Sequence, residues 1–214
     1  MSHRRSGAAT CWRWRQVTVV VAIALGGHAA QAQALRQPEA RQGYYLSAGA
    51  GANTLATWDK GQRDGTATGL ALTVHLGEML TDRWGLGLGI EDGSASRRGV
   101  TTAIGGLTLE AQARLWRHLA AHVGLGLGAA SAKDPARVGD ETHGTYGTLL
   151  TAGLSYDAFF TSYASGGTSR PSGGWAITPA CGLRAVPGGD ASTIAAVLTL
   201  SISWWSGLPA RELR

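Results

Sequence analysis

Along the chain after residue 42, apolar residues alternate with small or polar residues at every second position, in eight segments of about ten residues. Alternation at period two places one set on each face of a β-strand, whereas a helix repeats every three to four residues. In one segment, Leu107, Leu109, Ala111, Ala113 and Leu115 alternate with Thr108, Glu110, Gln112 and Arg114. The others are 43–53, 68–76, 84–90, 119–129, 145–156, 175–185 and 193–204. The pattern predicts an all-β chain.

The length and the non-apolar face of these segments indicate the type of sheet. Transmembrane β-strands need roughly 9–11 residues, while strands of soluble domains average about 5–6. The second face is mainly Gly, Ser and Thr rather than Lys, Asp and Glu, and Gly supplies 32 of 214 residues. Such a face suits a narrow lumen, with the apolar face toward lipid. We predict an eight-stranded antiparallel up-and-down transmembrane β-barrel over 43–205; a Gly-rich soluble protein is the alternative.

Residues 1–34 have the three parts of a secretory signal peptide: an arginine-bearing start, the apolar segment 17–25, and small residues with cleavage motifs ending at Ala32 and Ala34. A nine-residue helix spans about 14 Å, less than the roughly 30 Å of a bilayer core. Cleavage is therefore expected rather than anchoring. Because four arginines lie in this segment and the net charge is +5, the mature chain is close to neutral. Nucleic acid is not an expected partner.

The connectors alternate in length. Three are long and polar (54–66, 91–99 and 130–144), and two are short (77–83 and 116–118). Outer-membrane barrels have short periplasmic turns and longer external loops. The pattern therefore places both termini in the periplasm, with a lead at 35–42 and a tail at 206–214. The long connector 157–174 and the short one 186–192 do not follow it.

Aromatic residues gather at the strand ends that this topology places in the periplasm. Trp and Tyr favour the membrane interface because the ring is apolar while the N–H or O–H remains hydrated. We predict a membrane-interface girdle made of Tyr44, Trp84, Trp116, Trp175, Trp204 and Trp205.

A few charged or hydrogen-bonding side chains lie on the inward face. They are Glu110, Gln112, Arg114, His75, His122 and Arg184. Glu110 and Arg114 stand about 13 Å apart along one strand, so their partners must come from neighbouring strands. We interpret the set as an ion-pair network that fills and rigidifies the lumen; a proton or ion path is the alternative. No cofactor or metal site is predicted, since Asp134, Asp140 and Glu141 do not have the spacing of a calcium loop.

The whole mature chain, about 43–205, resembles the OmpA/OmpX-type family of eight-stranded outer-membrane barrels. The final strand, 197–204, is similar to the C-terminal assembly signal of that family, in which alternating apolar residues end in an aromatic residue. The resemblance implies that the barrel-assembly machinery reads Leu198, Leu200, Ile202 and Trp204. The tail 206–214 departs from the family, whose members commonly stop at the aromatic residue.

These patterns say more about fold than about activity. The leading interpretation is a non-enzymatic, structural or surface-interaction barrel of the outer membrane of a Gram-negative bacterium. We expect a monomer whose partners are membrane lipids and lipopolysaccharide. A small channel or transporter for hydrophobic or small solutes is the alternative. A lipid A-modifying enzyme ranks third: His143 lies near Asp140 and Glu141, but the family's His-x-Ser arrangement is absent, so no catalytic residue is predicted.

Overall fold

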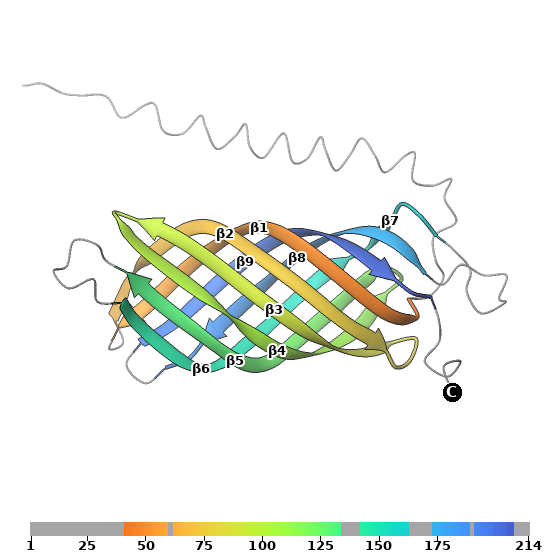
Figure 1. Cartoon of the computed structure of the whole chain (residues 1–214), viewed down its shortest axis with the longest axis horizontal. Helices are drawn as coiled ribbons and strands as arrows, with labels where there is room; N and C mark the ends of the chain where they lie inside the picture. Colours follow the sequence, from red (N-terminus) through yellow and green to blue (C-terminus); the bar gives the residue numbers. More distant parts are fainter. Residues whose placement is uncertain (1–40, 60–61, 134–141, 163–172, 189–190, 208–214) are drawn as a thin grey trace, which may run out of the picture. The chain divides into compact units, whose positions relative to one another are not determined.

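Eight long antiparallel strands form the wall of a barrel (Figure 1). The computed structural model describes residues 41–59, 62–133, 142–162, 173–188 and 191–207. The strands are β1 (Gly43–Asp59), β2 (Gln62–Met79), β3 (Trp84–Arg97), β4 (Val100–Trp116), β5 (Leu119–Lys133), β6 (Thr142–Tyr156), β8 (Gly174–Val186) and β9 (Ala191–Trp205). The two-residue β7 (Ala158–Phe159) follows β6 and also pairs with β8. The predicted signal peptide lies outside the described residues.

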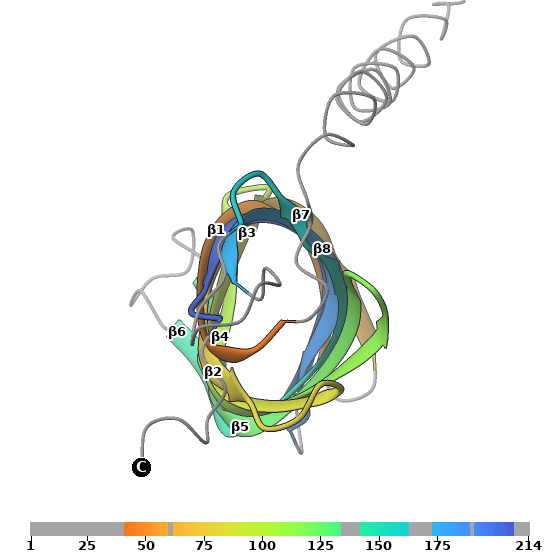
Figure 2. The same cartoon turned by 90° about the vertical axis from the view of Figure 1, so that its right-hand side faces the viewer.

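The sheet closes on itself, as the view along the barrel axis in Figure 2 shows. Each long strand pairs with its neighbour in the chain, and the first strand, β1, pairs with the last, β9. The ring is completed between β6 and β8, where Leu150 faces Ala185 and Ser155 faces Ala180. The predicted eight-stranded antiparallel barrel is thereby confirmed. The described part of the chain contains no helix long and apolar enough to cross a membrane.

We call the end where β1 begins and β9 ends the terminal end, and the opposite end the distal end. At the distal end the strands are longer than the sequence predicts. Most of the predicted loop 54–66 is strand, and the loop 91–99 is reduced to a turn at Arg98 and Gly99. Both turn residues have positive φ (51° and 87°), as a two-residue hairpin turn requires. The loop 130–144 likewise loses residues to β5 and β6.

The predicted boundaries of these distal loops were wrong because the alternation of inward and outward side chains continues beyond the apolar residues, in small and polar ones. Beyond the apolar part of β3, the residues Ser94 and Ser96 still point outward while Ala95 points inward. A rule that ends a strand at the last large apolar residue misses this extension. The wall therefore continues past the apolar region as paired strand rather than as loop.

The two faces of the wall differ as the alternation predicts. Around the barrel, large apolar side chains are exposed on the outer face, and we call this band the apolar belt. It contains Leu46, Leu70, Leu72, Val74, Leu76, Leu86, Leu88, Ile90, Leu107, Leu109, Val123, Leu125, Leu127, Leu150, Leu154, Ile177, Leu183, Ile194, Leu198, Leu200 and Ile202. The inward residues are buried or partly buried in the lumen, and some of them form the candidate site.

Candidate functional site

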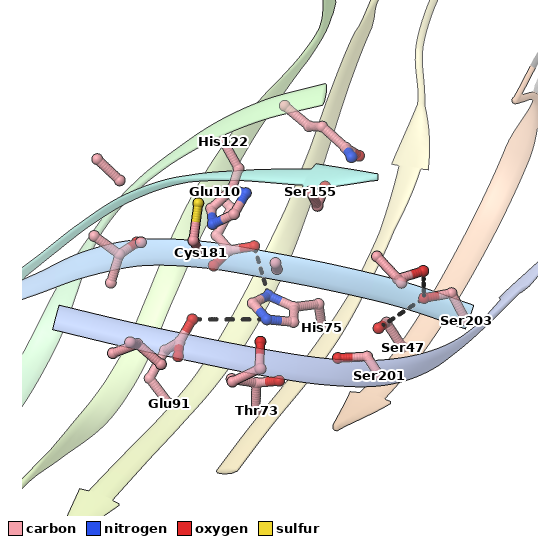
Figure 3. Close-up of a pocket in the computed structure, with 18 of the residues that line it drawn as sticks. Ser47, Thr73, His75, Glu91, Glu110, His122, Ser155, Cys181, Ser201 and Ser203 are labelled. Atoms are coloured by element: carbon pink, nitrogen blue, oxygen red, sulfur yellow. Dashed lines mark hydrogen bonds and ion pairs between the residues drawn. The ribbon is translucent and has the colours of Figure 1, made fainter. Parts of the chain in front are cut away.

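A layer of buried charged side chains crosses the middle of the lumen (Figure 3). His75 lies between two carboxylates: its Nδ1 is 2.9 Å from Glu110 Oε2, and its Nε2 is 3.7 Å from Glu91 Oε1. Arg184 forms an ion pair with Glu91 and also donates to the backbone carbonyl of Asp92 at 2.7 Å. Glu91, Glu110 and Arg184 are each no more than 4% exposed. The layer joins β2, β3, β4 and β8 through their side chains.

Glycines on neighbouring strands make room for this layer. A Cβ at Gly89 would meet the Glu110 carboxylate and lie 2.7 Å from Thr108 Oγ1. A Cβ at Gly153 would lie 2.7 Å from Nε2 of His122. These are closer than real Cβ contacts, so an alanine would displace the Glu110 carboxylate at the first position, and the His122 ring or the Cys181 backbone carbonyl at the second. Part of the glycine surplus therefore has a local cause: glycines stand where the lumen holds the larger polar side chains.

Beside the charged layer is a cavity of about 80 Å³. Its lining includes His75, Glu91, Glu110 and His122, together with hydroxyl and amide side chains. Three of the lining groups have no hydrogen-bond partner among the described residues: Thr73 Oγ1, Thr151 Oγ1 and Gln112 Oε1. The ligand-type atoms of His75, Glu91 and Glu110 all lie within 4.8 Å of one another. The cavity is thus polar and surrounded by groups that can bind a cation.

Toward the distal end the lumen is filled by apolar side chains. This distal cluster consists of Leu55, Ala95, Ile104, Ala130, Leu149, Val186 and Ala195, with Ala67 and Val197 packed against it. Every long strand contributes at least one of these residues. The sequence pattern did not predict the cluster, because Leu55 and Ile104 fall in or beside segments that were assigned to loops or left unassigned.

Toward the terminal end a second apolar group, the terminal cluster, consists of Tyr45, Met79, Phe159, Ala176 and Trp205. The rings of Tyr45 and Trp205 are 4.9 Å apart between centroids. A series of hydrogen bonds runs along one side of the lumen: Thr178 Oγ1 donates to Asp157 (2.6 Å) and is 2.8 Å from Ser203 Oγ, and Ser203 Oγ donates to Ser47 (2.9 Å). Apolar side chains therefore occupy the lumen on both sides of the charged layer.

The last residues before β1 also enter the terminal end. Arg41 is 2% exposed, forms an ion pair with Asp157 and donates to the backbone carbonyl of His118. Burial lowers the pKa of Arg41, whereas Asp157 raises it. At His118, burial and the Arg41 charge both lower the pKa of the imidazole. Residues 41–42 and 206–207, which the sequence assigns to a lead and a tail, thus pack against the barrel, with Gly207 N–H donating to the Gln42 carbonyl.

The predicted lumen residues divide into three groups. His75, Glu110 and Arg184 belong to the charged layer, and His122 and Gln112 line the cavity. Arg114 is not among the cavity-lining residues; its backbone N–H donates to Arg83 at the terminal end.

Sequence reasoning missed Glu91, which pairs with both His75 and Arg184. It was assigned to the loop 91–99. The available signal was that its position keeps the inward phase of Gly85, Gly87 and Gly89.

The structure shows which members of the predicted aromatic girdle lie on the outer face of the wall. Tyr44, Trp84, Trp116 and Trp175 are exposed on the outer face, and Trp204, which pairs with Trp175 across the sheet, is partly exposed. The assignment of Trp205 to the girdle is wrong, because its side chain is 2% exposed and packs inside the lumen. Adjacent strand residues point to opposite faces, so Trp204 and Trp205 cannot both face lipid.

Comparisons with known proteins bear on the fold. No protein-family model and no curated protein matches the sequence. Among solved structures, the attachment invasion locus protein Ail of Yersinia pestis is 14% identical, with a TM-score of 0.53 over 76% of this chain and 99% of that chain.

Neisserial surface protein A is 11% identical over 76% of this chain and 96% of its own, with a TM-score of 0.47. The N-terminal β-barrel domain of Pseudomonas aeruginosa OprF is 14% identical over 76% and 98%, with a TM-score of 0.42. The closed sheet and the similarity to Ail show that the chain has the fold of the eight-stranded outer-membrane β-barrels of the OmpA/OmpX type.

Proposed function

We propose that the protein is an integral outer-membrane barrel of a Gram-negative bacterium, with a structural and surface-contact role rather than a transport or catalytic one. The observation that carries the proposal is the apolar belt around a closed wall whose lumen is filled. A closed sheet leaves no unpaired edge, and an apolar exterior is the surface that lipid accepts. The segment 1–34 is expected to direct export.

The filled lumen supports a barrel that does not conduct. The distal cluster and the terminal cluster lie on either side of the charged layer. An ion entering from the distal end would lose hydration water against the apolar side chains of the distal cluster without a replacement ligand. We expect no single-channel steps from the folded protein in planar bilayers. Steady conductance would favour the alternative of a small channel.

The polar extension beyond the apolar belt supports the surface-contact role. Its outward residues include Thr54, Thr68, Ser94, Ser96 and Thr101, with side-chain hydrogen bonds between Ser96 and Thr101 (2.9 Å). Three cationic side chains, Arg97, Arg98 and Lys133, are exposed at the distal tips of β3, β4 and β5. Cationic side chains at the distal tips can form charge-assisted hydrogen bonds with the phosphate groups of lipopolysaccharide. Lipopolysaccharide is thus the partner that we propose for the distal end.

No catalytic role is proposed for the described histidines. His75 and His122 lie inside the lumen, and His118 lies at the terminal end beside Arg41. A reaction on membrane lipid would need groups open to the lipid or to the distal surface. His143, the remaining candidate from the sequence, has no described side chain.

Location is tested by fractionation and by gel migration. The overexpressed protein should co-sediment with outer membranes and migrate faster in unheated than in boiled samples. Recovery in the soluble periplasmic fraction without a heat shift would contradict the proposal.

The lipopolysaccharide contact is tested with two matched variants, Arg98→Asn and Arg117→Asn. Both residues are exposed turn arginines with positive φ, one at the distal end and one at the terminal end, and Asn accepts this backbone conformation. Arg98→Asn should lower the lipopolysaccharide that co-purifies per barrel, whereas Arg117→Asn should not. Equal loss in both variants, or no loss in either, would contradict a distal phosphate contact.

A further inference from the structure

The charged layer of the lumen contains more negative than fixed positive charge. Glu91 and Glu110 are carboxylates, and Arg184, paired with Glu91, is the guanidinium that faces them. Glu110 has His75 as its partner, and His75 is charged only when protonated. A buried carboxylate without a compensating cation is costly. The two buried carboxylates therefore share one fixed cation, and the adjacent cavity of about 80 Å³ has room for a second.

The side chains around this cavity are of metal-ligand type. One atom each from His75, Glu91 and Glu110 can be chosen so that all three lie within 4.8 Å of one another. Zinc binds imidazole nitrogen and carboxylate oxygen at about 2.0–2.2 Å, which separates tetrahedral ligands by about 3.4 Å. Rotations that close the gaps by about 1.4 Å or less would bring the three atoms to these distances. Glu91 keeps Oε1 available, because Arg184 is bound to its other oxygen.

A second observation points to a ligand in the same place. Thr73 Oγ1 is directed into the cavity lining, is without a hydrogen-bond partner in the described part of the chain, and belongs to a residue only 5% exposed. Thr73 is the cross-strand partner of Glu91, so its hydroxyl lies beside the carboxylate (Figure 3). Gln112 Oε1, on the same lining, is also unpartnered among the described residues. Buried oxygens of this kind normally bind hydrogen-bond donors, water or a cation.

We propose that the lumen binds one divalent transition-metal ion of the zinc type, with His75, Glu91 and Glu110 as its protein ligands. A site of mixed imidazole and carboxylate donors suits zinc and its neighbours better than Mg²⁺ or Ca²⁺, which prefer oxygen alone. A water held by Thr73 completes the coordination. Arg184 orients Glu91 from outside the coordination shell, as outer partners of metal ligands do. The proposal adds a binding site to the proposed structural role and does not depend on it.

The position of the site determines how it must be loaded. The cavity lies between the distal cluster and the terminal cluster, so exchange with solvent through the folded barrel should be slow. Metal is therefore offered both during refolding from urea into detergent and after folding. The untagged chain is used, because an added histidine tag would bind the same metals.

The binding experiment uses ZnCl₂ and CoCl₂ as probes on the folded chain. After dialysis against a weak chelator, the protein refolded with zinc should retain one ion per chain, and the cobalt form should show visible d–d absorption. Glu110→Gln and His75→Gln, which keep the size and hydrogen-bonding capacity of the side chain, should each weaken binding at least about tenfold. Asp92→Asn removes a neighbouring carboxylate on the outer face and should leave binding unchanged.

In the binding experiment, two results would overturn the proposal: no retained metal under either loading condition, or equal binding by wild type, Glu110→Gln and His75→Gln. Folding of each variant is checked by heat-modified migration and circular dichroism. If the variants fail to fold, zinc-edge X-ray absorption on the wild type decides. One imidazole nitrogen at about 2.0–2.1 Å supports the site, and a shell of oxygen alone overturns it.

Discussion

Arg41 Nε lies 2.8 Å from Asp157 Oδ2, with both side chains buried, so the residues just before β1 are tied to the connector that follows β6. Asp157 also accepts from Thr178 Oγ1 at 2.6 Å, and the Arg41 guanidinium carbon lies 5.3 Å from the centre of the Trp205 ring. Arg41 thus contacts three other parts of the barrel: the connector after β6 at Asp157, the β4–β5 turn at the His118 carbonyl, and β9 at Trp205. The ion pair lies at the terminal end beside the β6–β8 seam, whose ladder has fewer paired residues than the other ladders between long strands.

The first prediction concerns this ion pair. Arg41→Gln should lower the free energy of unfolding by about 3–5 kcal/mol, because it leaves the buried Asp157 carboxylate without its cation. Urea unfolding in lipid vesicles, followed by tryptophan fluorescence, measures the change. Arg117→Gln is the matched control, since this exposed arginine should cost about 1 kcal/mol or less. A small effect of Arg41→Gln would show that the terminal end does not rely on the pair.

The second prediction concerns pH. The pKa of His118 in the folded chain is lowered, first by burial and then by Arg41, below its ordinary value near 6.5. The unfolded chain therefore binds a proton more readily, so stability should fall as the pH drops through about 6.5. Between about pH 7.5 and about pH 5.5, wild type should lose more unfolding free energy than His118→Gln. Parallel pH profiles for the two proteins would contradict this assignment.

The third prediction concerns space in the lumen. Gly89→Ala should cost about 1–3 kcal/mol, because the new methyl group meets the Glu110 carboxylate and Thr108 Oγ1. The matched control is Gly147→Ala, whose Cβ would come within 3.5 Å of the Pro187 carbonyl and so make an ordinary contact. The control should be neutral or slightly stabilising. Equal costs in urea unfolding would mean that crowding is not the reason for Gly89.

The fourth prediction compares neighbours on β6. Leu149 is fully buried in the distal cluster, whereas Leu150 is exposed on the apolar belt. Leu149→Ala should cost about 2–5 kcal/mol, since it loses apolar burial and leaves a cavity. Leu150→Ala loses only the free energy of transferring the side chain from water to lipid, because lipid fills the vacated space. It should therefore lower the unfolding free energy less than Leu149→Ala does, by about 1 kcal/mol or more. A reversed order would mean that the distal cluster is loosely packed.

The alternation in sequence was enough to predict the wall of the barrel but not its full height. Residues with large apolar side chains, such as Leu107 and Leu109, show their phase clearly. Beyond Ile90 the outward positions are Asp92, Ser94 and Ser96, which resemble a loop in composition. Their strand conformation depends on backbone pairing with β4, a long-range interaction that composition does not report.

The candidate site was predicted in part for a related reason. Inward-pointing residues could be listed from the phase, which is how His75, Glu110 and Arg184 were found. Which of them meet depends on strand register and barrel stagger, and these follow from closure of the whole sheet. His75 and Glu91 come from neighbouring strands, whereas Arg184 comes across the lumen from β8. Such pairings across the lumen are not visible along any single strand.

The last prediction separates two roles of neighbouring tryptophans. Trp204 belongs to the predicted assembly signal and lies on the outer side, whereas Trp205 packs with Tyr45 and Arg41 in the lumen. If the assembly machinery reads the outward residues, Trp204→Ala should slow the appearance of heat-modifiable barrel in cells. It should change the unfolding free energy of the assembled protein less than Trp205→Ala does.

Trp205→Ala should instead lower the unfolding free energy by about 3–5 kcal/mol through loss of a buried aromatic side chain. Its rate of assembly in cells should stay closer to that of wild type. Pulse-chase labelling with unheated gels measures assembly, and urea unfolding of purified protein measures stability. Because the two residues differ by one position and have the same side chain, a loss of both properties in both variants would show that assembly follows stability rather than a signal on the outer face.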